Sequence, residues 1–548
     1  MMVVNTRSLS TGSESPESTA ALFRQACVLH EGGALVQAKA MCEAILNVQP
    51  AHVEALSRLG MIVGQSGDLM GAVQLFAQVT ALDPKHVVAT YNMAVAFYNM
   101  RRFNAALTVC DRVIAIKPDF ADAHFSRGNV LRDLNRLSAA RDCFERAIAL
   151  KPDNEEYFVN LGNVLRDLGQ LDAALMQYAR AIALNADCAE AHQCRGVVLM
   201  DLQQLPAALD SLERAIALKP DYAAAHCCKA YALLMAGDFE RGWAEYEWRR
   251  KDENGPLCRD NRSFSRPLWL GQCPIQGKTV LLHSEQGLGD TLQFCRYVKL
   301  VADLGARVIL EVPPALVTLL AGLGGVSQIA ERGSPLPEFD YQCSLLSLPL
   351  ALKTTLSTIP GGIPYLRSDA GRRNHWQSVL GGRTKPRVGL AWSGGFRSHQ
   401  PELWGVNGRR NIPLAKLAPL KSPEIEFYSL QKGRPAESEL AELIAKNWDG
   451  PQLRDHTSEL RDLADTAALI EQLDLVISVD TSIAHLVAAL GKPVWLLNRF
   501  DTCWRWMTVR TDSPWYPTMK LYRQERPGDW DGVVQRVKTD LLKLENRA

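Results

Sequence analysis

The sequence predicts an α-helical solenoid followed by an α/β module built from two lobes with parallel sheets. Three observations carry this prediction. A 34-residue spacing runs through the first half of the chain, and all twelve tryptophans lie between Trp243 and Trp530. After residue 278, two sets of short β-rich runs alternate with helical stretches. The change in tryptophan content marks a change of architecture.

The first half of the chain is expected to be a stack of helix pairs. Prolines recur every 34 residues, and small side chains recur twelve and twenty-four residues before each of these positions. The prolines are Pro50, Pro84, Pro118, Pro152 and Pro220, with Ala186 at the remaining step, and the small residues are Ala38, Ala72, Ala106, Ala140, Ala174 and Ala208, then Ala26, Gly60, Ala94, Gly128, Gly162 and Gly196. Small side chains let two helices cross closely, and proline ends the second helix. The period predicts six repeats.

A seventh repeat unit begins at Ala223 and departs from the pattern at its end. Gly242 replaces the expected alanine, and three aromatic residues, Trp243, Tyr246 and Trp248, follow in place of a repeat ending. Terminal repeats are atypical because they cover the end of the stack. We expect these aromatic residues to dock the solenoid onto the module that follows.

The same patterns divide the chain into five parts. We expect a disordered leader at 1–18, the solenoid at 19–252, a proline-containing linker at 253–277, a first lobe at 278–385 and a second lobe with a final crossing helix at 386–548. On the concave face of the solenoid, Asn92 and Asn160 share one repeat position. They would either grip an extended peptide or remain solvated helix-face amides.

Composition narrows the classes of partner and compartment. A net charge of +1 gives no reason to expect nucleic acid or an anionic membrane as the main partner. The thirteen cysteines are scattered without the spacing of a zinc site or a redox motif, which favours reduced thiols in a cytoplasmic protein. No segment reaches the roughly 18 apolar residues of a membrane span. We expect a cytoplasmic protein.

Continuous apolar runs predict the strands of the second half. The first set comprises 279–283, 307–311 and weaker strands near Ile329 and Tyr341, and the second set comprises 387–392, 426–430, 475–479 and 493–497. Such runs separated by helices indicate parallel sheets that are covered on both faces. Two sets in tandem predict two Rossmann-like lobes with a cleft between them. An amphipathic helix at about 529–542 is expected to fold back across the lobes.

The loop after the first strand is one candidate site. Gly287 and Gly289 permit close backbone approach, and Asp290 precedes a helix expected from Thr291. Asp290 would act as a carboxylate base toward an acceptor hydroxyl. Alternatively, Asp290 caps the helix, with Gln293 completing a capping box.

The second candidate site is the turn Asp480–His485, which leaves a strand of the second lobe and opens a helix. Backbone N–H groups and the hydroxyls of Thr481 and Ser482 suit a diphosphate, and His485 lies in the first turn. The alternative is an ordinary N-cap with His485 as a partly buried spacer.

Basic and aromatic residues accompany these loops. Arg409, Arg410 and Lys432 follow strands of the second lobe and would neutralise phosphate charge or remain solvated. A late aromatic segment contains Trp504, Trp506, Trp515 and Tyr516. It would pack between the lobes or stack on a base or sugar. Asp529-Trp530-Asp531 is interpreted as a helix cap, so no metal site is predicted.

Taken together, these motifs resemble bacterial proteins that join tetratricopeptide repeats to a module like the family 9 glycosyltransferases, the heptosyltransferase group. The resemblance covers about residues 20–545. It rests on the segments Glu285–Thr291, Val388–Gly394, Ser429–Gly433, Val479–His485 and Ser513–Pro517. The architecture also looks like that of protein O-GlcNAc transferases. The first lobe is shorter than in heptosyltransferases, and the second turn lacks their usual glycine.

The resemblance implies a GT-B fold and a metal-independent, inverting transfer from a nucleotide-sugar donor, with no further cofactor. It implies Asp290 as the base and a donor site near Gly287 and Gly289. The same site would use Asp480, Thr481, Ser482 and His485, with Arg410 or Lys432 as the basic residue. The solenoid would recruit a protein acceptor or partner on its concave face. The alternative is a non-catalytic repeat scaffold that carries a degenerate transferase module. A dehydrogenase is a weaker option, because no Gly-x-Gly-x-x-Gly opens either lobe.

Overall fold

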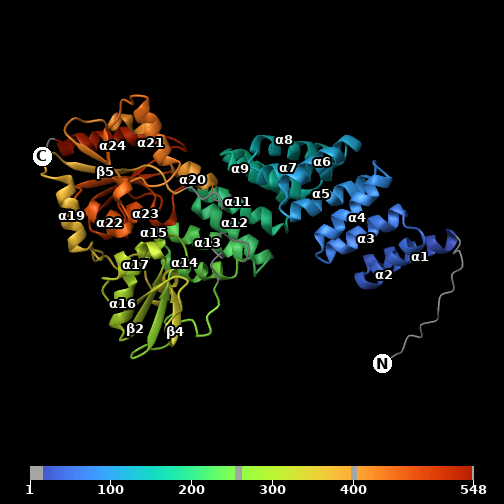
Figure 1. Cartoon of the computed structure of the whole chain (residues 1–548), viewed down its shortest axis with the longest axis horizontal. Helices are drawn as coiled ribbons and strands as arrows, with labels where there is room; N and C mark the ends of the chain where they lie inside the picture. The colour runs from blue at the N-terminus through green and yellow to red at the C-terminus, as the bar shows by residue number, and fades with distance from the viewer. Residues whose placement is uncertain (1–15, 253–261, 396–403, 546–548) are drawn as a thin grey trace. The chain divides into compact units, whose positions relative to one another are not determined.

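The computed structural model of the chain describes residues 16–252, 262–395 and 404–545 (Figure 1). Internal contacts divide the chain into two compact units, Met1–Cys188 and Ala189–Ala548. Residues 1–15 of the predicted leader and residues 253–261 of the predicted linker lie outside the described residues. The first described helix begins at Pro16.

The first unit consists of five helix pairs. They are α1 (Pro16–Glu31) with α2 (Leu35–Val48), α3 (Val53–Gln65) with α4 (Leu69–Leu82), α5 (Val87–Asn99) with α6 (Phe103–Ile116), α7 (Ala121–Asp133) with α8 (Leu137–Leu150), and α9 (Glu155–Asp167) with α10 (Leu171–Leu184). The predicted small residues lie where the paired helices cross. A Cβ atom on Gly162 would lie 2.5 Å from the Cε1 atom of Tyr178. The ring of one helix thus occupies the space that a side chain on the other would need, which confirms the repeat interpretation.

Asn160, one of the two predicted peptide-gripping asparagines, is buried and already partnered. Its amide nitrogen donates to the carbonyl of Glu156 at 3.0 Å, and its side-chain oxygen accepts from Arg132 at 2.9 Å. The solvated alternative is therefore wrong for Asn160. Its amide joins two neighbouring repeats of the first unit.

The second unit begins with two further helix pairs and continues into the α/β module. The helices are α11 (Ala189–Asp201), α12 (Leu205–Leu218), α13 (Ala223–Ala236) and α14 (Phe239–Tyr246), followed by the 3-10 helix η1 (Glu247–Arg250). The predicted seventh repeat is therefore α13, α14 and η1. A Cβ atom on Gly242 would lie 2.8 Å from the Cγ atom of Leu234, so glycine serves the close crossing there.

The first lobe of the module has a four-stranded parallel sheet in the order β3-β2-β1-β4. Its elements are β1 (Thr279–His283), α15 (Leu288–Phe294), η3 (Cys295–Tyr297), α16 (Val298–Asp303), β2 (Arg307–Val312), α17 (Pro314–Leu320), β3 (Val326–Glu331), β4 (Tyr341–Ser344), η4 (Leu345–Ser347) and α18 (Leu348–Ala351). All four predicted strands are present. Val280, Leu281 and Leu282 of β1 are fully buried, as expected for a parallel strand covered on both faces.

The second lobe has a six-stranded parallel sheet in the order β10-β9-β8-β5-β6-β7. Its elements are α19 (Ala370–Leu380), β5 (Arg387–Ala391), α20 (Trp404–Arg410), η6 (Leu414–Leu420), β6 (Glu426–Ser429), α21 (Ala436–Ala445), β7 (Leu453–Asp455), η7 (Thr457–Glu459), α22 (Leu463–Glu471), β8 (Leu475–Val479), α23 (Ser482–Ala489), β9 (Val494–Asn498), η8 (Trp504–Trp506), β10 (Met519–Arg523) and α24 (Trp530–Glu545). Counted from β5, this is the doubly wound order 3-2-1-4-5-6, so the predicted Rossmann-like lobe is confirmed.

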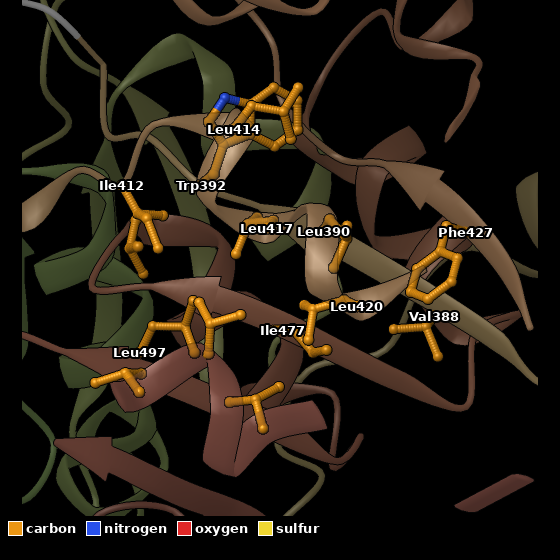
Figure 2. Close-up of a cluster of buried hydrophobic side chains, with 14 of the residues drawn as sticks. Val388, Leu390, Trp392, Ile412, Leu414, Leu417, Leu420, Phe427, Ile477 and Leu497 are labelled. Carbon is orange, nitrogen blue, oxygen red and sulfur yellow. The ribbon is translucent and has the colours of Figure 1, made fainter. Parts of the chain in front are cut away.

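The core of the second lobe is a cluster of buried hydrophobic side chains, to which Val388 and Leu390 of β5 and Ile477 of β8 belong (Figure 2). Val533 and Val537 of the last helix, α24, belong to the same cluster. The final helix, expected to cross the lobes, packs through this face on the second lobe's own core. The predicted cap is confirmed, because the Asp529 carboxylate accepts from the Gly532 N–H at 2.9 Å.

Within the described ranges, no helix combines the length and the apolar character needed to cross a bilayer.

Candidate functional site

Both candidate loops leave their sheets where the strand order reverses. In the first lobe β1 lies between β2 and β4, and in the second lobe β5 lies between β6 and β8. The loop Gly287–Asp290 follows β1, and the turn Asp480–His485 follows β8. Ligands of doubly wound sheets bind beyond the carboxyl ends of strands at such switch points.

In the first loop, the helix starts earlier than the sequence suggested. Helix α15 begins at Leu288 with Gly287 as its N-cap, so the expected start at Thr291 and the capping box between Asp290 and Gln293 are wrong. Asp290 is the third helical residue, and its Oδ2 atom accepts the Gly287 N–H at 2.9 Å. Gly287, which has no side chain, lets the helix begin before Asp290, and the carboxylate folds back on the cap.

The other carboxylate oxygen of Asp290 forms an ion pair with Arg505 of η8. The Arg505 side chain is 9% exposed and that of Asp290 is 21% exposed. Arg505 also donates from Nε to the side-chain oxygen of Gln293 at 2.6 Å. Burial by itself lowers the pKa of Arg505, but the Asp290 carboxylate together with Cys503 and Tyr246 outweighs it, so this pKa lies above its usual value.

Sequence reasoning missed Arg505. The feature that could have indicated it is its place between two buried tryptophans, Trp504 and Trp506. A cation in such a segment requires a partner, because burying an unpaired charge is costly. The partner lies 215 residues away in the sequence, in the other lobe. Only the folded chain reveals it.

The second turn opens α23 without a side-chain cap. Thr481 is the N-cap residue of this eight-residue helix and makes no capping hydrogen bond. Its hydroxyl lies 3.3 Å from the hydroxyl of Ser478 instead. Asp480, Thr481 and Ser482 are half-buried. The first N–H groups of a helix lack partners within the helix, and the start of a helix is therefore a common place for an anion to bind.

His485 joins the second turn to the first loop. A Cβ atom on Gly289 would lie 2.9 Å from the Cδ2 atom of His485 and 3.5 Å from the Cα atom of Ser482. On its other side, the Nδ1 atom of His485 lies 2.9 Å from the hydroxyl of Tyr516. Burial lowers the pKa of His485 to about 3, so the ring is neutral near pH 7. The structure therefore brings Gly289, Ser482 and His485 together where α15 meets α23.

The two basic candidates differ in their surroundings. Arg410 ends α20, donates from Nη2 to Asn407 Oδ1 at 2.6 Å and lies against Gly394. Gly394 follows β5, which is the neighbour of β8 in the sheet. Lys432 is exposed, and its ammonium donates to the carbonyl of Leu460, which follows β7 and η7. Arg410 therefore lies beside the β5–β8 switch point, whereas Lys432 is hydrogen-bonded to the segment that follows η7.

Arg409, the third basic candidate, is paired. Its Nε atom donates to Asp501 Oδ2 at 2.8 Å. The chain thus holds Arg409 at the segment between β9 and η8. Its charge is balanced there by a carboxylate that is mostly buried.

The late aromatic segment packs between the parts of the second unit. Trp504, Trp506, Trp515 and Tyr516 are all buried. The Trp504 ring centroid lies 5.3 Å from that of Trp243 in α14. Phe294 of α15 lies 5.7 Å from Trp515. Packing is therefore the observed role of this segment, as the sequence favoured.

Two of the three predicted docking aromatics take part in this cluster. Trp243 contacts Trp504, and Tyr246 lies 6.5 Å from the same ring. Trp248 does not follow the prediction. It stacks on His226 of α13, with ring centroids 3.8 Å apart and an interplanar angle of 2°. The 3-10 turn η1 carries Trp248 back onto its own repeat.

Family models match part of each half of the chain. Models of the tetratricopeptide repeat match residues 65–126 and, in overlapping units, 128–166, 162–203 and 196–237. The model of glycosyltransferase family 9 (heptosyltransferase) matches residues 429–497. The second match includes Lys432 and the turn Asp480–His485. It ends before Arg505 and does not include the loop Gly287–Asp290.

Protein FlbA of Caulobacter vibrioides is 28% identical over 341 residues, covering 57% of this chain and 54% of that protein. The chain therefore spans about half the length of this curated relative. Similar solved structures include PilF of Pseudomonas aeruginosa (15% identity, 38% of this chain, 95% of that chain, TM-score 0.35). They also include a tetratricopeptide repeat protein of Parabacteroides merdae (16% identity, 44% and 94%, TM-score 0.38). The chain thus combines tetratricopeptide repeats with a C-terminal domain of glycosyltransferase family 9, the heptosyltransferase family.

Proposed function

We propose that the C-terminal module transfers a sugar from a nucleotide-sugar donor to an acceptor hydroxyl, and that the repeats recruit a protein acceptor or partner on their concave face. One observation carries the proposal. The loop after β1 and the turn after β8 meet at Gly289 and His485, so the two switch points lie next to each other. The thirteen scattered cysteines suit a reducing cytoplasm, where we place the reaction.

The donor diphosphate would bind at the start of α23. The first N–H groups of this helix and the hydroxyls of Thr481 and Ser482 supply hydrogen bonds. Arg410 would add a positive charge from the side of β5. His485 is neutral and buried, so its part is to hold α23 against Gly289 and not to balance phosphate charge. These groups would stabilise the departing diphosphate without a metal or another cofactor.

Asp290 would be the base. Oδ2 accepts the Gly287 N–H and Oδ1 is paired with Arg505, but each carboxylate oxygen keeps a second lone pair. The acceptor oxygen would attack the anomeric carbon from the face opposite the diphosphate, forming the new C–O bond as the old one breaks. Asp290 takes the acceptor proton, and the sugar inverts its configuration.

A non-catalytic scaffold remains the second candidate, and the Asp290–Arg505 pair favours it. A carboxylate that neutralises a buried arginine has a structural reason to be present even without chemistry. In that case the module would support the repeats and bind no donor.

The test separates these roles with a panel of ADP-, UDP-, GDP- and CDP-sugars, using thermal shift for binding and sugar release for turnover. Asp290→Asn is preferred to Asp290→Ala, because the amide retains an oxygen that can accept from Gly287 or Arg505. Donor binding with turnover lost in Asp290→Asn supports the base assignment. If no nucleotide sugar stabilises the wild-type protein, the transferase proposal fails.

A further inference from the structure

We propose that Arg249, in the last turn of the terminal repeat, is a positioning residue for the loop Gly287–Asp290. The proposal rests on the transferase function above for its activity readout, but its structural readout stands without it. It gives the solenoid a second role besides recruitment, because the terminal repeat would hold one wall of the site in place.

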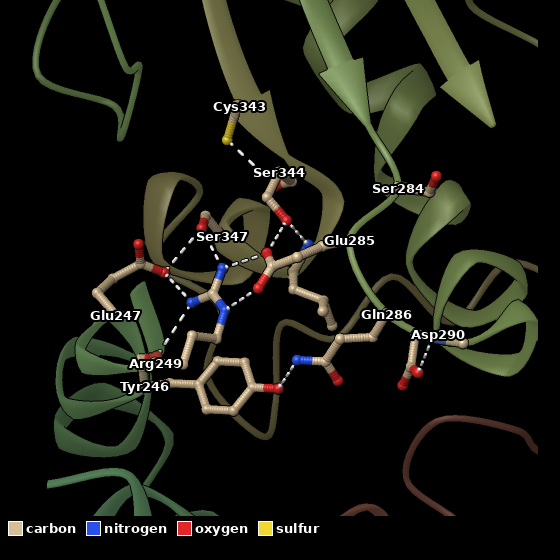
Figure 3. A network of polar contacts seen from close by, with 12 residues as sticks. Tyr246, Glu247, Arg249, Ser284, Glu285, Gln286, Asp290, Cys343, Ser344 and Ser347 are labelled. Atoms are coloured by element: carbon tan, nitrogen blue, oxygen red, sulfur yellow. Dashed lines mark hydrogen bonds and ion pairs between the residues drawn. The ribbon is translucent and has the colours of Figure 1, made fainter. Parts of the chain in front are cut away.

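All five N–H donors of the Arg249 guanidinium are used (Figure 3). Nε and Nη2 donate to the two oxygens of Glu285, each at 2.8 Å. Nη1 donates to Glu247 at 2.6 Å and to the carbonyl of Tyr246 at 3.1 Å, and Nη2 also donates to Ser347 at 2.7 Å. The side chain is 0% exposed. Five bonds leave the guanidinium one orientation only.

The two bonds from Arg249 to Glu285 hold the segment that connects β1 to the candidate loop. Glu285 lies two residues after β1 and two residues before Gly287, the N-cap of α15. Its carboxylate also accepts from the hydroxyl of Ser344, the last residue of β4. The ion pair therefore sits at the β1–β4 switch point of the first lobe, where the chain turns toward the site.

The neighbouring residue is held by the same repeat. Gln286 donates from Nε2 to the hydroxyl of Tyr246 at 3.2 Å. Tyr246 itself lies beneath the guanidinium, with 4.7 Å between the Arg249 Cζ atom and the ring centroid. Both residues that precede Gly287 are thus bonded to the terminal repeat. Their positions set where α15 begins, and hence where Asp290 points.

The surrounding charges favour the ion pair between Arg249 and Glu285. Arg249 faces two carboxylates, Glu247 and Glu285, in a buried setting. Burial by itself raises the pKa of Glu285, but Arg249 and the Ser344 hydroxyl together outweigh it, so this pKa lies below its usual value. Glu285 is therefore ionised near pH 7, and its ion pair with Arg249 is kept there.

The test compares Arg249→Lys with a matched control, Arg387→Lys. Lysine keeps the charge but cannot form the bidentate fork. Arg387 is also buried and bonded to a glutamate, Glu426, but it lies at the start of β5, away from the loop. For both variants, hydrogen exchange of peptides from 284–294 and 475–490 is followed in the full chain, together with kcat and the donor KM.

We expect Arg249→Lys to raise the exchange rate of 284–294 about tenfold and to lower kcat about tenfold, with 475–490 and the donor KM unchanged. Arg387→Lys should alter neither the loop nor kcat. Equal loop exchange in the two lysine variants overturns the proposal, even in a protein that turns over no donor. Faster loop exchange with unchanged kcat, in a protein whose wild type is active, overturns it as well.

A second variant separates positioning from stability. Arg249→Gln with Glu285→Gln removes one charge of each sign, so the net charge of the site is kept. We expect this double variant to recover most of the Tm lost by Arg249→Gln alone while kcat stays low, because neutral amides do not fix the loop as the fork does. Recovery of kcat together with Tm would show that Arg249 acts through stability alone, which contradicts the proposal.

Discussion

Asp290 at the start of α15 and Arg505 in η8 form an ion pair that joins the two lobes of the C-terminal module. The proposed base is therefore also the counter-ion of a mostly buried arginine. Because Asp290 has both roles, a variant of Asp290 affects both. Loss of activity on truncating Asp290 has two possible causes, lost proton transfer and an unpaired Arg505.

A double-mutant cycle separates these causes. Asp290→Asn and Arg505→Gln should each lower the free energy of unfolding by about 3 kcal/mol, since each leaves a partly buried charge without its partner. The double variant should lose less than the sum, because no unpaired charge remains. Urea unfolding of the four proteins measures the coupling. Additive losses would mean that the pair does not contribute to stability.

Acid should weaken the module through His485. Its pKa falls from 6.5 to about 3 on burial. Between these values the unfolded chain binds a proton that the folded chain does not. The free energy of unfolding therefore falls as the pH falls, by about 1.4 kcal/mol per pH unit.

His485→Gln removes this titration and keeps a group that can bond to Tyr516. Urea unfolding between about pH 7 and about pH 5 should then show a smaller slope in the variant than in the wild type. Parallel slopes would show that His485 titrates normally in the folded protein.

Gly289→Ala tests the contact between the two loops. The added methyl group would lie 2.9 Å from the Cδ2 atom of the buried His485 ring, so this ring or the two helices α15 and α23 must shift. We expect a loss of about 1–3 kcal/mol in the free energy of unfolding and a drop in turnover. Gly322→Ala is the control, because a Cβ atom there meets no atom within 4 Å. Equal stability of the two alanine variants would contradict the observed contact.

Arg410 and Lys432 are predicted to differ in donor binding. Arg410→Ala should raise the donor Kd about tenfold or more, since charge-assisted hydrogen bonds contribute about 1.5–3 kcal/mol. Lys432→Ala should change the Kd little, because its ammonium is bonded to the Leu460 carbonyl. Titration calorimetry with the nucleotide found in the panel measures both. A larger increase of the donor Kd in Lys432→Ala than in Arg410→Ala would mean that Lys432, and not Arg410, is the basic residue of the donor site.

The local patterns of the sequence predicted most of the elements. The strands β1, β2, β5, β6, β8 and β9 coincide with the apolar runs within two residues at either end. Two edge strands were missed. β7 has only three residues, of which Arg454 and Asp455 are exposed, and β10 has the exposed Lys520 among buried residues. Edge strands are covered less completely, so they lack the continuous apolar run of a central strand.

The candidate site was predicted in part. Its two loops follow from glycine and cap signals next to buried strands, and they do meet, at Gly289 and His485. The start of α15 was misplaced, because the cap is a glycine and Asp290 folds back onto it from inside the helix. Arg505 and Arg249 were missed, because each is paired with a residue in a different element. The sequence shows that a residue carries a charge, but it does not show which opposite charge lies beside it in the folded protein.

The sequence by itself determined the repeat period, the two parallel sheets and the loops that leave them, because periodicity and apolar runs are local properties of the chain. Only the tertiary structure decided that Asp290 is paired with Arg505, that His485 is buried and neutral, and that Arg249 of the last repeat holds Glu285. These contacts join residues from 36 to 215 positions apart. Burial and pairing depend on what the fold places beside a group, which no local pattern encodes.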